Sequence, residues 1–131
     1  MVFLDTSALY ALADRGDTRH EVARERFRTL VESGEALLTH NYVLVESMAL
    51  IQHRLGLAAA LKLAEGARAF EIEWVDAHTH EAALRGLAAG TRRRVSFVDQ
   101  VSFVVMTSRH VDTALAFDPD FEVEGFQLYG A

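Results

Sequence analysis

The sequence predicts an α/β domain that spans residues 1–131, with a parallel β-sheet between two layers of helices. Three observations lead to this prediction. Short apolar segments of strand length alternate with segments of helical periodicity, as in folds built from βα units. The 131 residues correspond to one domain, and half of them are hydrophobic. No linker, low-complexity tract or internal repeat divides the chain.

Five segments have the length and composition of β-strands. The first is apolar until its last residue, Asp5, as expected of a buried central strand. The second and fourth are also short apolar segments, whereas the third, EIEWV, alternates polar and apolar residues and predicts one solvent-exposed face. The fifth is short and closes the pattern. The predicted strands are residues 2–5, 36–39, 71–75, 113–117 and 127–129.

Two helical segments follow each of the first three strands. Thr18 and Glu21 match the T-x-x-E capping box at a helix start, and Asn41 and Asp76 are residue types that cap helices. Gly56 ends the third helix, because glycine favours helix termination. The predicted helices are residues 6–13, 18–33, 41–55, 57–69, 76–90 and 96–110.

Charge and composition exclude several classes of protein. The chain has 13 basic and 19 acidic residues, a net charge of −6, which argues against a protein that coats nucleic acid without sequence preference. The absence of cysteine excludes disulfides, thiolate zinc sites and cysteine nucleophiles. The six histidines have no metal-ligand spacing, so we expect them at the surface. No apolar segment has membrane-spanning length and no basic leader precedes the first strand, so we expect a cytoplasmic protein.

Four carboxylates have largely apolar neighbours in the sequence. Asp5 and Asp118 end the first and fourth strands, where an N-cap and an Asx-turn are the ordinary structural roles. Glu46 has apolar helical neighbours and no basic residue within about a turn, and charged residues of this kind are rarely buried unpaired. Asp99 matches the S-x-x-D capping pattern with Ser96, but its helix is otherwise strongly apolar. Together the four acids indicate a site at the carboxyl edge of the sheet.

A cluster of this kind predicts a divalent cation. Two unit charges about 4 Å apart at an effective dielectric near 20 repel by about 4 kcal/mol, so bare carboxylates would partly protonate. Oxygen ligands without His or Cys suit Mg²⁺ or Mn²⁺. Such ions activate water and bind phosphate oxygens, so the predicted chemistry is phosphodiester hydrolysis.

Four sequence segments, in their order and spacing, resemble those of a known family. They are LDTSAL at 4–9, VESMAL at 45–50, SFVDQVSFVVM at 96–106 and AFDPDF at 116–121, followed by Gly125 and Phe126. The set resembles the PIN-domain ribonucleases, and is most similar to the VapC-type toxins of toxin–antitoxin pairs. The resemblance implies a three-layer α/β/α domain with a four- or five-stranded parallel sheet and a Mg²⁺- or Mn²⁺-dependent endoribonuclease.

The resemblance also assigns roles to particular residues. It implies that four acids catalyse the reaction, with Asp5 and Asp99 as metal ligands; the four are Asp5, Glu46, Asp99 and Asp118. Thr6, more loosely Ser7, and Ser96 match hydroxyls that support these acids. Asp120 matches an additional acid of some members, and Pro119 leaves open whether Asp118 or Asp120 faces the metal.

The same resemblance implies an RNA substrate, a small antitoxin protein that lies across the acidic pocket, and a homodimer. Arg92, Arg93 and Arg94 precede the Asp99 helix and have two interpretations, a solvated loop or a contact to RNA phosphates. The apolar stripe at 57–63 is either a dimer face or ordinary core. Two other functions stay open: a catalytically silent PIN-like interaction module, and an aspartyl-phosphate enzyme or receiver-like domain. The second is disfavoured because Lys62, the single lysine, is on a predicted helix.

Overall fold

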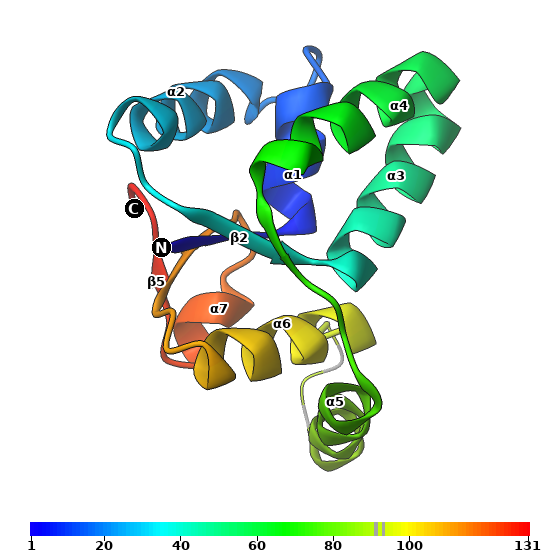
Figure 1. Ribbon diagram of the computed structural model, residues 1–131, viewed down its shortest axis with the longest axis vertical. Coiled ribbons are helices and arrows are strands. Elements are labelled where there is room, and N and C mark those ends of the chain that lie inside the picture. Colours follow the sequence, from blue (N-terminus) through cyan, green and yellow to red (C-terminus); the bar gives the residue numbers. More distant parts are fainter. Residues whose placement is uncertain (91, 93) are drawn as a thin grey trace.

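A five-stranded, entirely parallel sheet forms the centre of the computed structural model, which describes residues 1–131 except 91 and 93 (Figure 1). The strand order is β3-β2-β1-β4-β5, so the first strand occupies the middle of the sheet. The predicted α/β class and parallel sheet are therefore confirmed. The strands are β1 (Val2–Leu4), β2 (Leu37–His40), β3 (Glu71–Glu73), β4 (Thr113–Leu115) and β5 (Gln127–Leu128).

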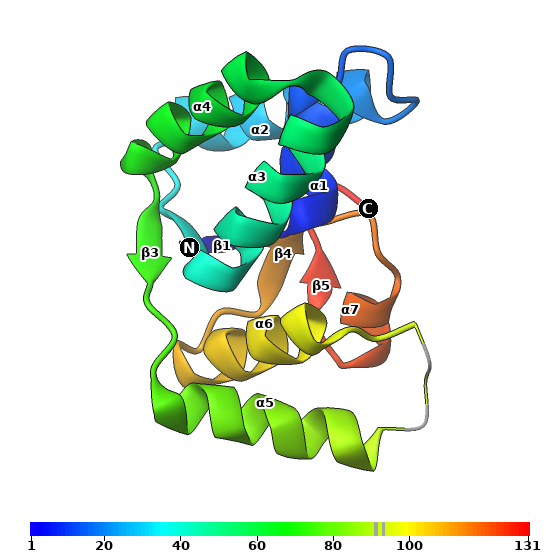
Figure 2. The ribbon, with the colours of Figure 1, turned by 90° about the vertical axis from the view of Figure 1, so that its right-hand side faces the viewer.

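Helices cover both faces of this sheet and complete three layers (Figure 2). The first four helices, α1 to α4, pack together on one face, and α5, α6 and α7 lie on the other. Gly56, with a φ of 98°, lets α4 follow α3 directly, because this backbone region favours glycine. The helices are α1 (Thr6–Ala13), α2 (His20–Glu32), α3 (Asn41–Leu55), α4 (Leu57–Gly66), α5 (Ala77–Ala89), α6 (Phe97–Ser108) and α7 (Asp120–Val123), with a 3₁₀ turn at Ala67–Ala69.

Two of the predicted helix caps are wrong. The side chain of Asp17 accepts a hydrogen bond from the Arg19 N–H at 2.8 Å and shapes a turn, so α2 begins after Thr18 and the predicted capping box does not form. At α3 the cap is His40, because the Asn41 side chain instead accepts from the N–H of Val75 at 2.7 Å. Asp76 caps α5 as predicted.

The sequence does not predict the short helix α7, since four residues carry too little periodicity to be recognised. This helix contributes Phe121, which is fully buried and packs against Phe3 and Phe103 at ring-centroid distances of 6.3 and 5.2 Å. Phe3 belongs to β1, which is buried along its whole length between β2 and β4. The carboxyl end of β1 is therefore held firmly by its neighbours in the sheet and by the helices packed against it.

His40 is completely buried, which contradicts the prediction that all histidines lie at the surface. Its Nδ1 accepts from the Val43 N–H at 3.2 Å, so the ring proton is on Nε2 and is donated to Ser102 Oγ at 2.9 Å. Ser102 in turn donates to the Val98 carbonyl oxygen at 3.1 Å. Burial lowers the pKa of His40 to about 3, so the ring is neutral and joins the starts of α3 and α6.

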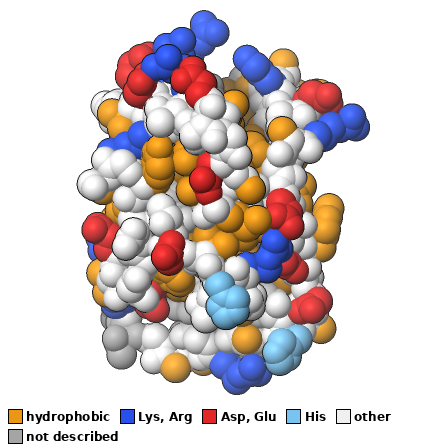
Figure 3. Space-filling view, turned by 60° about the vertical axis from the view of Figure 1, so that its left-hand side comes forward, with side chains coloured by type: hydrophobic (Ala, Val, Ile, Leu, Met, Phe, Trp, Pro, Cys, Tyr) orange, Lys and Arg blue, Asp and Glu red, His pale blue; other side chains and the backbone are white. Residues whose placement is uncertain are grey.

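Apolar surface remains exposed on the face covered by α1, α2 and α4. A groove of about 650 Å³ there is lined mainly by apolar side chains, including Leu12, Phe27 and Phe70. Figure 3 shows hydrophobic side chains gathered on one face of the molecule, with acidic and basic side chains around them. The stripe at 57–63 is divided: Leu57 and Leu61 are 59% and 55% exposed, whereas Ala60 is buried and Leu63 packs against the core. Among the described residues, no helix is long and apolar enough to cross a membrane.

Candidate functional site

Four of the predicted site residues lie where the central strands end and the helices begin. β1 ends at Leu4 and Asp5 caps α1, whereas Asp118 follows β4, the strand beside β1. Asp99 is in the first turn of α6, and Glu46 is on α3. Because the strands are parallel, their carboxyl ends meet at one edge, and that edge is the usual ligand site of an open α/β sheet.

Asp5 is the most buried acid of the four, at 4% exposure. Its Oδ2 accepts two hydrogen bonds from Ser7, one from the backbone N–H at 3.1 Å and one from Oγ at 2.6 Å. Burial is the main cause that raises its pKa to about 6, and repulsion by Asp99 adds to the increase. Asp5 therefore combines the structural role of an N-cap with a carboxylate whose ionisation is costly.

Asp99 is held in place by the capping box predicted with Ser96. The Ser96 N–H donates to Asp99 Oδ2 at 2.9 Å, and Ser96 Oγ accepts from the Asp99 N–H at 3.1 Å. Burial raises the pKa of Asp99, and the charges of Asp118 and Glu46 raise it further. Since Asp99 also raises the pKa of Asp5, it is electrostatically coupled to each of the other three acids.

Glu46 joins this group, although its apolar neighbours in the sequence do not enclose it. Both Glu46 and Val45 are exposed, because this side of α3 faces solvent. Glu46 Oε1 accepts a hydrogen bond from Thr6 Oγ1 at 2.7 Å. Thr6 thus links the beginning of α1 to the acid on α3, which fits the supporting role implied for its hydroxyl.

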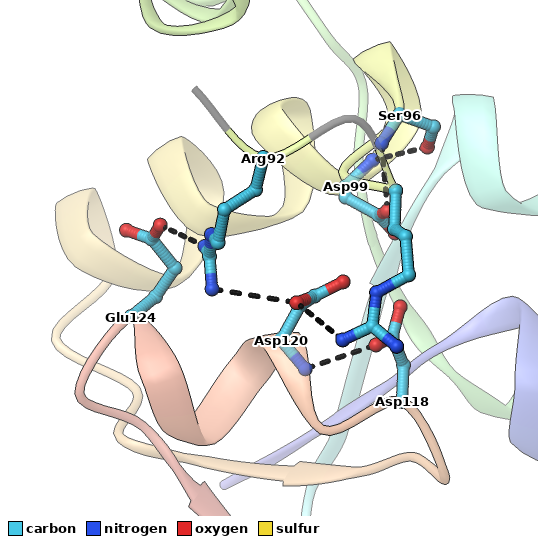
Figure 4. A network of polar contacts seen from close by, with 7 residues as sticks. Arg92, Ser96, Asp99, Asp118, Asp120 and Glu124 are labelled. Atoms are coloured by element: carbon cyan, nitrogen blue, oxygen red, sulfur yellow. Dashed lines mark hydrogen bonds and ion pairs between the residues drawn. The ribbon is translucent and has the colours of Figure 1, made fainter. Parts of the chain in front are cut away.

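Asp118 and Asp120 have different surroundings, which separates the two acids that the sequence left open (Figure 4). Asp118 Oδ1 accepts from the Asp120 N–H at 2.9 Å, the predicted Asx-turn, and Asp118 faces Asp99 closely enough to raise the pKa of Asp99. Asp120 is 1% exposed and contacts Arg92 Nη1 at 3.3 Å and Arg94 Nη2 at 3.5 Å. Asp118 therefore acts directly on Asp99, whereas Asp120 pairs with the two arginines and raises the pKa of Asp118.

The arginines of residues 92–94 also differ from one another in their surroundings. Arg92, whose side chain is 31% exposed, binds Asp120 and also donates to Glu124 at the end of α7. The side chain of Arg94 is 74% exposed and contacts Asp120 alone among the described residues. Arg93 lies outside the described residues. Arg92 is thus mostly occupied by intramolecular ion pairs, whereas Arg94 presents its guanidinium group to solvent.

Replacing Arg92 with Gln is expected to lower the free energy of unfolding by about 1–3 kcal/mol. The change removes a charged partner from the buried Asp120 carboxylate, and an unsatisfied buried acceptor is costly. Arg94→Gln is the matched control and is expected to change stability by less than about 0.5 kcal/mol, because the Arg94 side chain is 74% exposed and Arg92 still pairs with Asp120 in this variant. Urea denaturation of both variants measures the difference, and a larger destabilisation by Arg94→Gln would contradict this assignment.

Ser7 contributes more to the site than the loose match of its hydroxyl implied. Besides donating to Asp5, its Oγ accepts a hydrogen bond from the N–H of Phe117 at 3.0 Å. One hydroxyl therefore fixes the first acid to the chain segment that carries Asp118. The signal was present in the sequence as a hydroxyl two residues after Asp5, a position from which Ser commonly bonds a capping Asp.

The donor set of this cluster fits a hard divalent cation. All four acids offer carboxylate oxygens. Burial raises the pKa of Asp5 and Asp99, repulsion by the neighbouring acids adds to the increase, and a bound cation would compensate for both effects. Within the part of the chain that the structure describes, no three His, Cys, Asp or Glu side chains already have the arrangement of a metal site. The residues thus fit the ion by charge and donor type.

Comparison with known proteins identifies the class of protein to which this site belongs. The model of the PIN domain family matches residues 2–125. The chain therefore belongs to the PIN-domain family, and it is an endonuclease, a hydrolase of phosphodiester bonds. The predicted resemblance is confirmed, and the receiver-like and catalytically silent alternatives are wrong.

Individual relatives are similar over nearly the full length. The chain is 37% identical over 131 residues to the 23S rRNA-specific endonuclease VapC20 of Mycobacterium tuberculosis, in strains CDC 1551/Oshkosh and H37Rv, covering 96% of this chain and 95% of each relative. Among solved structures, the crystal structure of M. tuberculosis VapC20, described as a sarcin–ricin loop cleaving toxin, has a TM-score of 0.87 and 36% identity. That match covers 96% of both chains.

Proposed function

We propose that this chain, acting as one PIN domain over residues 1–131, is a metal-dependent endoribonuclease and the toxin of a toxin–antitoxin pair. The observation that supports this most strongly is the electrostatic coupling of Asp99 to Asp5, Glu46 and Asp118, which come from separate elements of the fold. Acids that raise one another's pKa in a half-buried cluster are costly to maintain, and such clusters are characteristic of functional sites.

Each residue of the cluster has a distinct role in the proposed reaction. Asp5 and Asp99 would hold Mg²⁺ or Mn²⁺, while Glu46 and Asp118 complete the pocket. The bound cation would supply Lewis-acid chemistry, making the attacking water more acidic and neutralising charge that develops on the phosphate. Ser96 keeps the Asp99 carboxylate oriented through its backbone N–H at 2.9 Å, and Thr6 holds Glu46 through its hydroxyl at 2.7 Å.

The substrate we propose is RNA, and ribosomal RNA is the first candidate. The relatives are named for 23S rRNA and for the sarcin–ricin loop, and the structural similarity extends over nearly the whole chain. An endonuclease for such a substrate acts in the cytoplasm. Arg94 would contact RNA phosphates, which its 74% exposure supports, and Arg92 and Arg93 belong to the same basic segment of the sequence.

Two protein partners are part of the proposal. A small antitoxin would lie across the acidic pocket and block access of RNA to Asp99 and its neighbours. A second copy of this chain would form a homodimer, for which the exposed Leu57 and Leu61 of α4 offer apolar surface. Size-exclusion chromatography with light scattering distinguishes a monomer from a dimer directly.

Metal removal tests the proposed reaction. Purified protein is incubated with total RNA and with a sarcin–ricin loop oligonucleotide, in Mg²⁺, in Mn²⁺ or with a chelator. We expect cleavage in either metal and none with the chelator, because without a cation the coupled carboxylates repel a phosphate group. Readdition of metal to the chelated sample is expected to restore cleavage. Equal cleavage with chelator would contradict the metal dependence, and no cleavage of any RNA would contradict the proposed substrate class.

A further inference from the structure

A basic and aromatic cluster surrounds the side chain of Phe117, the residue that precedes Asp118 in the chain. The ring of Phe117 is flanked by two guanidinium groups, with Cζ of Arg19 at 5.2 Å and Cζ of Arg26 at 5.8 Å from the ring centroid. Phe117 directly precedes Asp118, and its N–H is bound by Ser7 Oγ. We call Arg19, Arg26 and Phe117 the Phe117 cluster.

The positive charge of the Phe117 cluster is not neutralised by the part of the chain that the structure describes. Arg19 is exposed, and neither Arg19 nor Arg26 has a carboxylate within ion-pair distance among the described residues. Arg26 donates to the carbonyl oxygen of Gly130 at 3.1 Å, which orients the group without removing its charge.

Two other arginines of α2 show the contrast. Arg24 contacts Glu21 at 3.7 Å, and Arg28 contacts both Glu25 and Glu32. These arginines follow the usual arrangement of a solvated helix, in which pairs three or four residues apart compensate each other. The arginines beside Phe117 depart from that pattern, and they do so next to a pocket of acids.

The chemistry of the Phe117 cluster suits a polynucleotide. Guanidinium groups bind phosphate oxygens through two parallel hydrogen bonds. Stacking on the ring also holds each guanidinium in position before a ligand arrives. Basic groups then lie on both sides of Asp118 in the chain, with Arg19 at Phe117 and Arg94 at Asp120.

We propose that the Phe117 cluster is a second contact for the RNA substrate, which binds a backbone phosphate adjacent to the one that is cleaved. This inference rests on the proposed ribonuclease function and extends it, because it names residues outside the acidic pocket that hold the same strand. Arg19 binds the phosphate, Arg26 adds charge and packs against the ring, and Phe117 holds both guanidinium groups in position.

Salt-dependent binding tests this second contact. The affinity for a short single-stranded RNA is measured over a range of salt concentrations in the Asp99→Asn background, so that the RNA is not cut. The double variant Arg19→Gln/Arg26→Gln is expected to bind about tenfold more weakly at low salt. The slope of the logarithm of its affinity against the logarithm of the salt concentration is expected to become shallower by about 0.7 for every phosphate that the variant no longer binds. Phe117→Leu, which keeps an apolar side chain but lacks the ring, is expected to weaken binding several-fold.

The matched control is Arg24→Gln/Arg28→Gln, which removes the same charge from α2, the helix that contains Arg26 and that Arg19 precedes. We expect it to keep the salt slope of the parent protein. In the protein that retains Asp99, the double variant Arg19→Gln/Arg26→Gln is expected to raise KM with little change in kcat. If these arginines only stabilised the fold, the double variant would instead have a lower melting temperature. The single variant Arg19→Gln keeps the bond of Arg26 to Gly130 and guards against an effect caused by misfolding.

The outcomes separate this inference from the function on which it rests. If the parent protein cleaves RNA but the Phe117-cluster and control variants bind RNA alike, the second contact is refuted and the ribonuclease proposal stands. If the Phe117-cluster variant binds RNA normally but no longer binds a protein partner, the surface serves that partner and the inference is refuted. If the parent protein cleaves no RNA with metal, the proposed function itself fails.

Discussion

Replacing Asp99 with Asn is expected to reduce RNA cleavage by at least about 10²-fold while leaving the protein folded. The charge of Asp99 interacts with the charges of all three other acids, so we expect a cation bound by the cluster to interact with Asp99. Loss of one group that stabilises charge in a transition state typically costs about 10²–10³-fold in rate. Asn retains an oxygen that can accept the Ser96 N–H, so the start of α6 is preserved.

The matched control for this variant is Asp76→Asn. Asp76 caps α5 through the same kind of hydrogen bond, in its case to the Thr79 N–H at 2.8 Å, but it does not belong to the acidic cluster. We expect Asp76→Asn to cleave RNA at the rate of the parent protein. Cleavage rates in saturating Mg²⁺ and circular dichroism spectra of both variants provide the comparison. Undiminished cleavage by Asp99→Asn would refute the assigned site.

Replacing Asp5 with Asn is expected to abolish cleavage and, in the absence of metal, to stabilise the protein. The pKa of Asp5 is about 6 in the folded chain and close to 3.8 when the chain is unfolded. Between these values the folded state binds more protons than the unfolded state, so stability falls as the pH rises from about 4 to 6. The difference corresponds to about 3 kcal/mol at neutral pH, an upper figure because the neighbouring acids titrate together.

Thermal unfolding at two pH values measures this effect. With chelator at pH 7.5, Asp5→Asn is expected to unfold at a higher temperature than the parent protein, whereas near pH 4 the two should unfold at similar temperatures. Mg²⁺ is expected to raise the melting temperature of the parent at pH 7.5 and that of the variant much less. A lower melting temperature for Asp5→Asn at pH 7.5 would show that its carboxylate stabilises the fold, contrary to this prediction.

Several features that depend on neighbouring residues in the sequence were predictable, although the capping box of Thr18 and Glu21 was not among them. The capping box of Ser96 and Asp99 and the caps of Asp5 and Asp76 require only a short spacing, and all of them form. The apolar first strand likewise indicated its central place in the sheet. These caps and this strand depend only on residues that lie within one turn of helix or within one strand.

Features that depend on how elements pack were not predictable in the same way. The exposure of Glu46 follows from the side of α3 that faces the sheet, and its apolar neighbours in the sequence do not determine that side. The Asn41 side chain makes a long-range bond with Val75 in place of a cap, and His40 is buried against Ser102, 62 residues away. The pairing of Arg92 with Asp120 similarly joins two segments that are distant in the sequence.

The hydrogen bond between Ser7 and Phe117 has a consequence for the synthesis of this protein. It joins residues 110 positions apart, and β1 pairs with β4 beside it, so the acidic pocket needs two segments that are made far apart in time. Asp5 and Asp118 can meet only after the segment that carries β4 and Asp118 has left the ribosome. Until then the nascent protein carries no assembled nuclease site.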